Sequence, residues 1–309
     1  MRPKFDGVLF FPVTPFTETG TVDLDLLARH VAKGVDAGPG GVFIACGTGE
    51  FHALESQEFG DIVRVAVETV AGRVPVYAGA GGSIAQAKQF AQSAKANGAD
   101  GLLLLPPYLV EMPQAGLVAF TREIAAATDL PVIVYNRNNA RYTEDSAIEV
   151  AKIPNVIGFK DGTGDLDQVA RIVRAVTDAV GDDFLFFNGL LTAELTQAAY
   201  RGIGIPLYSS AVFAMAPDIA NAFYAAYIAR DDVARERLLR EFYRPLVALR
   251  DTVPGYAVAL VKAGVRQGGL PVGGVRAPLL DPTPEHEARL ADLLDHAREL
   301  TAPAIPGPV

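Results

Sequence analysis

The sequence predicts an α/β protein, a (β/α)8 TIM barrel with a helical appendage at its C-terminus. Short apolar segments alternate with longer amphipathic segments eight times, and successive apolar segments are roughly 25 to 30 residues apart. A (β/α)8 barrel has this number and spacing of strand–helix units. The short segments are apolar without interruption and do not alternate with polar residues. Strands of that kind are buried on both faces, as in a parallel sheet.

The elements follow in order along the chain. Strands are expected at residues 7–16, 40–48, 74–82, 100–107, 131–137, 156–163, 183–189 and 204–210. The segments between them carry apolar residues at helical spacing, with Gly38 and Gly98 as helix stops and Ser83 as a helix N-cap. An open doubly wound sheet is the alternative, but eight regular units exceed its usual scheme.

The chain continues beyond the eighth unit, which is expected to end near residue 230. This divides the protein into a barrel over 1–230 and a C-terminal helical region over 231–309. Helices of that region are expected at about 231–250, 255–267 and 284–299. The final residues, "APAIPGPV", are expected to form a loose tail.

The composition narrows the class of function. The 309 residues carry a formal net charge of −9 and no basic cluster, so a nucleic-acid partner is not expected. An anionic substrate would therefore need local positive groups. No segment is apolar for long enough to span a membrane, and Pro12 and Pro15 interrupt the first apolar run, which we interpret as a strand and not a signal peptide. A single cysteine fits a reducing compartment, and we expect a cytoplasmic protein.

The histidines do not suggest a metal site. The chain has four of them, and none lies at ligand spacing from cysteine or carboxylate residues, so no metal is expected. His30 and His296 fall in helical patterns and are expected on the surface.

In a barrel of this kind the active site forms at the C-terminal ends of the strands. Polar residues are therefore candidates wherever an apolar segment ends. They are Thr14; Thr48 and Glu50 in "CGTGE"; Tyr108 in "PPY"; Tyr135, Asn136, Arg137, Asn138, Asn139 and Arg141 after the fifth strand; Lys160; Asn188; and Tyr208, Ser209 and Ser210.

Lys160 is the most informative candidate, because it alone among the lysines ends a core strand. Burial in a barrel mouth disfavours the charged form of an amine and frees its lone pair. Such an amine can condense with a ketone to form an imine, which accepts electrons from an adjacent carbanion. The alternative is a lysine paired with Asp161 or Asp165.

Two neighbouring features would complete such a site. Tyr135 ends the adjacent strand, where its hydroxyl could transfer protons, although tyrosine is also an ordinary strand residue. The backbone N–H groups of Gly47, Thr48 and Gly49 could hold a carboxylate, although a tight turn also needs glycine.

These motifs, in their order and spacing, resemble the class I pyruvate-aldolase superfamily, which includes dihydrodipicolinate synthase and N-acetylneuraminate lyase. The likeness runs from about residue 7 to residue 300 and is carried by "CGTGE", "PPY", "VIVYN" and "GFKDGTGD". It implies that Lys160 forms a Schiff base, that Tyr135 relays protons and that Thr48 with nearby amides holds a carboxylate. It also implies a homotetramer that needs no cofactor, with Tyr108 near the substrate.

The departures from the synthase pattern concern the substrate. Gly47 stands where the synthase has the first of two threonines, and "YNRNNA" lacks the synthase's proline and substrate-binding arginine. "YNRNNA" instead resembles the branch that dehydrates and decarboxylates the sugar diacid 5-dehydro-4-deoxyglucarate. That substrate needs a second anion site. The expected substrate-binding residues are Gly47, Thr48, Gly49, Tyr108, Asn136, Arg137, Arg141, Ser209 and Ser210. Two alternative functions remain. The protein could be another aldolase or synthase of the superfamily, or a barrel that only binds a keto acid.

Overall fold

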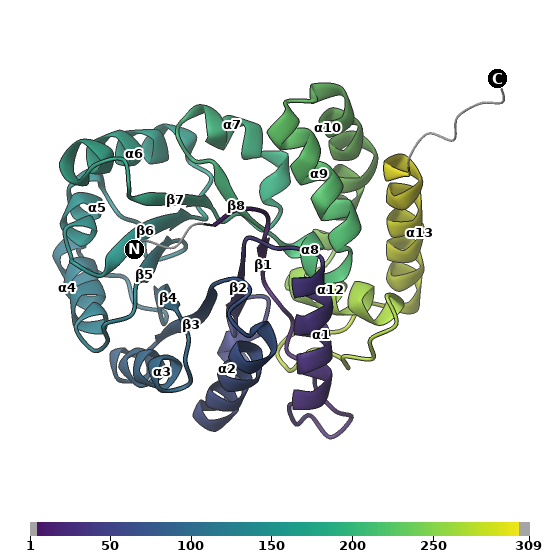
Figure 1. Cartoon of the computed structure of the whole chain (residues 1–309), viewed down its shortest axis with the longest axis horizontal. Coiled ribbons are helices and arrows are strands. Elements are labelled where there is room, and N and C mark those ends of the chain that lie inside the picture. The colour runs from purple at the N-terminus through teal and green to yellow at the C-terminus, as the bar shows by residue number, and fades with distance from the viewer. Residues whose placement is uncertain (1–4, 303–309) are drawn as a thin grey trace.

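The computed structural model describes residues 5–302, in which eight parallel strands close into a barrel (Figure 1). The first strand pairs with both the second and the eighth. The strands are β1 (Leu9–Phe10), β2 (Gly41–Ile44), β3 (Val76–Gly82), β4 (Gly101–Pro107), β5 (Val132–Asn136), β6 (Val156–Asp161), β7 (Leu185–Asn188) and β8 (Leu207–Ser210). The closure confirms the predicted fold class and excludes an open doubly wound sheet.

The first strand is much shorter than the segment 7–16 that the sequence predicts. Pro12 and Pro15 follow β1 closely and have no N–H to donate to a neighbouring strand. The chain therefore leaves the barrel after two paired residues, and Phe16 pairs instead with Val22 in an isolated antiparallel bridge.

Helices surround the barrel on the outside (Figure 1). They are α1 (Leu24–Asp36), η1 (Phe51–Ala53), α2 (Ser56–Val70), α3 (Ile84–Ala96), α4 (Gln114–Ala125), α5 (Glu144–Ala151), α6 (Leu166–Val180), η2 (Ala193–Leu195), α7 (Gln197–Gly202), α8 (Ala211–Met215) and α9 (Pro217–Ala229). Ser83 caps α3, because its side chain accepts a hydrogen bond from the Gln86 amide. Gly38 and Gly98 follow the ends of α1 and α3 with φ of 75° and 83°, as expected of helix stops.

The C-terminal helices gather on one side of the barrel, beside α9 (Figure 1). They are α10 (Asp232–Leu238), η3 (Leu239–Tyr243), α11 (Arg244–Arg250), α12 (Tyr256–Gln267) and α13 (Pro284–Thr301). The expected helix over 231–250 is interrupted by η3, which is a π-helix. Pro245 explains the interruption, since it cannot donate the α-helical hydrogen bond to Glu241. The expected tail begins at Ala302, and its remaining residues lie outside the described part of the chain.

The barrel interior is filled with aromatic rings at its lower end. The Phe5 ring lies 5.8 Å from that of Phe43, 5.4 Å from Tyr77 and 5.6 Å from Phe187, measured between centroids. These rings belong to a core separate from the larger one between strands and helices. These rings fill the barrel interior, and the C-terminal ends of the strands are left for a site.

One histidine differs from its expected position. His30 is buried in α1, where its Nε2 accepts a hydrogen bond from the Val13 amide at 3.3 Å. Burial, reinforced by the charge of Lys33, lowers the His30 pKa to about 3. The expected surface location is therefore wrong for His30, whereas His296 is exposed as predicted. No helix among residues 5–302 could cross a membrane.

Candidate active site

A cavity of about 1220 Å³ lies at the C-terminal ends of the strands. Its lining includes many of the expected site residues: Gly47, Thr48, Tyr108, Tyr135, Arg137, Lys160 and Ser209. Val258 and Val261 of α12 also line it, so the C-terminal helical region supplies part of the wall. The cavity is therefore formed by the barrel and by this region together.

The pairing of β5 with β6 places Tyr135 directly beside Lys160. Both side chains point into the barrel, and Lys160 is only 5% exposed. Its Nζ lies 4.0 Å from the centroid of the Tyr135 ring and 5.0 Å from that of Phe11. The amine therefore stands between two aromatic rings at the base of the cavity.

The carboxylates near Lys160 in sequence are engaged elsewhere. Asp161 is fully buried on the outer side of β6 and accepts hydrogen bonds from Asn136 at 2.7 Å and from the Tyr200 hydroxyl at 2.5 Å. Asp165 caps the start of α6 through the Gln168 amide. Pairing of Lys160 with either aspartate, the alternative interpretation of the sequence, is therefore wrong.

The Tyr135 hydroxyl has two hydrogen-bond partners. It donates to the Gly189 carbonyl at 2.5 Å and accepts from Arg137 Nη1 at 2.9 Å. Burial alone would raise the Tyr135 pKa, but the positive charges of Lys160 and Arg137 outweigh it and lower the pKa overall. The phenol is thus set up to lose its proton more readily than an ordinary tyrosine.

Glycines make room for the Tyr135 ring. A Cβ on Gly189 would lie 2.7 Å from Lys160 Cγ and 2.8 Å from Tyr135 Cε2, and one on Gly162 would also lie 2.8 Å from Tyr135 Cε2. A side chain at Gly189 would therefore displace both the lysine and the tyrosine, and one at Gly162 would displace the tyrosine. The sequence places Gly189 at a strand end, but gives no sign of this close approach.

The turn after β2 has free backbone donors. Thr14 Oγ1 donates to the Gly49 carbonyl at 2.7 Å and fixes the turn from the end of β1. Within residues 5–302, no protein acceptor is found for the amides of Gly47, Thr48 and Gly49. Gly47 and Thr48 also line the cavity, so these amides and the Thr48 hydroxyl can hold a carboxylate.

A buried ion pair lies behind this turn. Lys262 Nζ of α12 is 2.6 Å from Glu50 Oε1, and both side chains are fully buried. Glu50 also accepts a hydrogen bond from the Arg276 amide at 2.8 Å. Burial lowers the Lys262 pKa, and the Glu50 carboxylate partly offsets that effect. Sequence reasoning placed Lys262 on a helix and assigned it no partner.

Cys46, in the same turn, is not a nucleophile in this site. It is fully buried, and burial raises the pKa of its thiol to about 12 despite the nearby charge of Lys160. Among residues 5–302 no group of three histidine, cysteine or carboxylate side chains could hold a metal ion.

Four of the expected substrate-binding residues lie outside the cavity lining, and three of them bond elsewhere. Asn136 turns outward to Asp161, and Ser210 caps α8 and donates to Glu194 at 2.5 Å. Arg141 donates to the Asn138 carbonyl at 3.2 Å. The substrate contacts expected of these three residues do not fit their positions. The fourth, Gly49, belongs to the turn and contributes only backbone.

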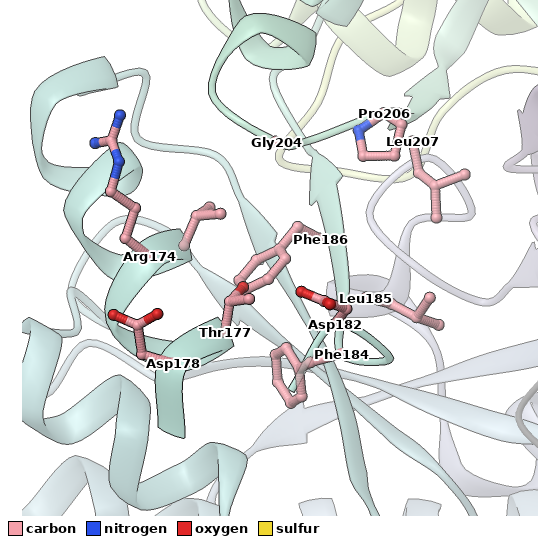
Figure 2. Close-up of a pocket in the computed structure, with 11 residues that line it drawn as sticks. Arg174, Thr177, Asp178, Asp182, Phe184, Leu185, Phe186, Gly204, Pro206 and Leu207 are labelled. Atoms are coloured by element: carbon pink, nitrogen blue, oxygen red, sulfur yellow. The ribbon is translucent and has the colours of Figure 1, made fainter. Parts of the chain in front are cut away.

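A second, smaller cavity lies at the opposite end of the strands. It measures about 510 Å³ and is lined by residues from the end of α6 and the starts of β7 and β8. Figure 2 shows Arg174, Thr177 and Asp178 on α6, with Phe184 and Phe186 across the cavity. None of the expected site residues lines it. In barrels this end serves stability, whereas the opposite end carries the chemistry.

Comparison with known proteins places the chain in one family and finds similar dehydratases. Residues 4–297 match the model of the dihydrodipicolinate synthetase family. A probable 5-dehydro-4-deoxyglucarate dehydratase from Streptomyces coelicolor is 56% identical over 95% of this chain and 93% of its own length. The 5-dehydro-4-deoxyglucarate dehydratase of Pseudomonas putida is 41% identical over 94% of each chain.

Solved structures resemble the whole fold. Dihydrodipicolinate synthase from Oceanobacillus iheyensis superimposes with a TM-score of 0.88 at 26% identity, covering 96% of this chain and 97% of its own. N-acetylneuraminate lyase from Mycoplasma synoviae gives a TM-score of 0.81 at 25% identity, covering 95% and 98%. The likeness therefore includes the C-terminal helices as well as the barrel.

Proposed function

The chain belongs to the dihydrodipicolinate synthetase family, and we propose that it is a lyase that dehydrates and decarboxylates 5-dehydro-4-deoxy-D-glucarate. The products are 2,5-dioxopentanoate, water and carbon dioxide, and one proton is consumed. The observation that carries the proposal is 56% identity over nearly the whole chain to curated dehydratases of that name. The cavity supports it with an amine, a phenol of lowered pKa and a set of free amides.

The proposed substrate contacts follow the cavity lining. The turn of Gly47, Thr48 and Gly49 holds the carboxylate beside the ketone, close to Lys160. Arg137 and Ser209 also line the cavity and are the groups we assign to the distal carboxylate. Tyr108 stands at the rim of the same cavity and is 71% exposed.

The reaction begins with the amine. Lys160 attacks the C5 ketone and loses water to give an iminium, which makes the C4 protons acidic. Tyr135, as phenolate, removes a C4 proton and leaves an enamine. The enamine then expels the C3 hydroxyl, which takes the proton back from Tyr135 and leaves as water, and a conjugated iminium remains. Loss of this hydroxyl is the dehydration step.

Decarboxylation follows after a proton shift. Moving the C2 proton to C5 converts C2 into a ketone conjugated with the C3–C4 double bond. The C6 carboxylate then departs as carbon dioxide, and its electron pair passes through that double bond to the C2 oxygen. Protonation restores an imine at C5, and hydrolysis releases the aldehyde and frees Lys160. The iminium is the electron sink for loss of the C4 and C2 protons, the C2 ketone is the sink for decarboxylation, and Lys160 stays bound to C5 until the final hydrolysis.

The test is product analysis. Purified protein is incubated with the diacid, and carbon dioxide and 2,5-dioxopentanoate are measured together. The proposal predicts equal amounts of both. A condensation product from pyruvate and aspartate semialdehyde, with no turnover of the diacid, would contradict it and favour the synthase alternative.

The proposed setting is a cytoplasmic homotetramer that acts on a small sugar diacid, with no nucleic-acid or membrane partner. Exposed apolar side chains support an assembly. Leu109 and Val110 follow Tyr108 at the cavity rim and are 82% and 57% exposed. Sedimentation of the purified protein measures the oligomeric state directly.

A further inference from the structure

We propose that Arg137 is the positioning residue that sets the charge of Tyr135, so that Tyr135 serves as the base in the reaction. This inference rests on the proposed function, in which Tyr135 removes a proton from the imine. It assigns to Arg137 a role toward a protein side chain, in addition to a role toward substrate.

The geometry around the phenol carries the inference. Arg137 Nη1 donates to the Tyr135 hydroxyl at 2.9 Å, and the guanidinium carbon lies 5.6 Å from the ring centroid. Lys160 approaches the same ring at 4.0 Å. The Gly189 carbonyl accepts a hydrogen bond from the Tyr135 hydroxyl at 2.5 Å, which favours the neutral form of the phenol. The phenol is thus held between one acceptor and two cationic side chains.

Of these two cations, Arg137 alone keeps its charge throughout the reaction. Lys160 must be a neutral amine when it attacks the ketone, so it contributes no positive charge at that stage. A guanidinium does not lose its proton in a protein. Arg137 therefore stabilises the phenolate before the iminium forms, and continues to do so afterwards.

Lys160 also acts on the charge of Tyr135, but among residues 5–302 Arg137 is the permanently charged side chain that donates a hydrogen bond to the hydroxyl. Within residues 5–302, the hydrogen bonds of the Tyr135 hydroxyl go to Gly189 and Arg137. A Cβ at Gly47, where the synthase pattern has a hydroxyl, would meet nothing within 4 Å. A protein lacking that hydroxyl needs another partner for the tyrosine, and Arg137 is in hydrogen-bond contact with it.

The experiment is a spectroscopic titration of Tyr135 in the full-length protein without substrate. The chain has no tryptophan, so tyrosinate absorbance is unobscured. Subtracting the curve of Tyr135→Phe isolates the Tyr135 signal. Burial raises the pKa of several other tyrosines, among them Tyr77 and Tyr142, so they ionise later.

Arg137→Met should shift the Tyr135 titration upward by about one pH unit, about a tenfold loss of phenolate at a given pH. Arg137→Lys should reverse part of this shift, because a lysine restores the positive charge but not the planar guanidinium. Arg141→Met is the matched control, since Arg141 lies outside the cavity lining, and it should leave the curve unchanged. An unchanged curve in Arg137→Met would overturn the inference.

Kinetics with the diacid give a second readout. In Arg137→Met, kcat should fall and its rise with pH should move to higher pH by the same amount as the titration. A residue that only binds substrate would raise KM and leave the pH profile in place, and that result would contradict the inference. Because the titration needs no substrate, failure of the proposed function and failure of this inference are distinguishable.

Discussion

Replacing Lys262 by methionine should destabilise the protein strongly, although Lys262 does not line the cavity. Its ammonium lies 2.6 Å from the Glu50 carboxylate, and both side chains are fully buried. Removing one partner of such a pair costs about 3 to 5 kcal/mol, because the other charge stays buried without compensation. At roughly 2.1 cal/mol/K per residue, the entropy of unfolding is about 0.65 kcal/mol/K for the whole chain, so the midpoint should fall by about 5 to 8 °C.

Scanning calorimetry measures this shift directly. The double variant Lys262→Met/Glu50→Gln should recover much of the loss, because it removes the uncompensated carboxylate. Lys152→Met is the matched control, since Lys152 is exposed, and it should melt as the wild type does. The variant should also bind substrate more weakly, because Glu50 ends the turn that holds the carboxylate. If Lys262→Met melts like the control, the buried pair does not hold the turn and the reasoning is refuted.

Two further predictions concern Gly189 and Glu194. Gly189→Ala should lower kcat about 100-fold and cost about 1 to 3 kcal/mol of stability, because the new Cβ would meet Lys160, Tyr135 and the Asp161 carbonyl at under 3 Å; Gly202→Ala, with open space around it, should retain wild-type kcat. Burial raises the Glu194 pKa to about 7, so the folded state should lose about 3 kcal/mol as pH rises from roughly 4.5 to 7. Urea titrations across this range should show that slope in the wild type and not in Glu194→Gln.

The barrel and its central pair could be predicted because both depend on local pattern. Continuous apolar segments mark buried parallel strands, and each segment's end marks the rim of the barrel. Lys160 and Tyr135 end successive strands, and neighbouring strands in a barrel pair, so their side chains meet. The helix stops and the Ser83 cap follow from equally local rules.

Strand alternation explains why two of the expected site residues do not line the cavity. Successive residues of a strand face opposite sides, so an inward Tyr135 requires an outward Asn136. The same rule turns Ser209 inward and Ser210 toward the helices. This alternation was available in the sequence, and applying it at every strand end would have removed both residues from the expected site.

The remaining features depend on tertiary packing. Glu50 and Lys262 lie far apart in the chain, and no local pattern pairs a turn after β2 with a lysine of α12. The role of Gly189 follows from the distance between its backbone and two side chains on other strands. Arg137 is two residues after Tyr135 in the sequence, but the direction of its guanidinium depends on the cavity wall around it.

Trapping of the imine tests the central claim most directly. Borohydride is added to the protein during turnover of 5-dehydro-4-deoxyglucarate, and peptide masses locate the reduced adduct. The account predicts one adduct per chain, on Lys160, with loss of activity in proportion to labelling. Lys160→Ala should remain folded, take up no adduct and release no carbon dioxide. Labelling of a different lysine, or turnover of the diacid by Lys160→Ala, would contradict the account.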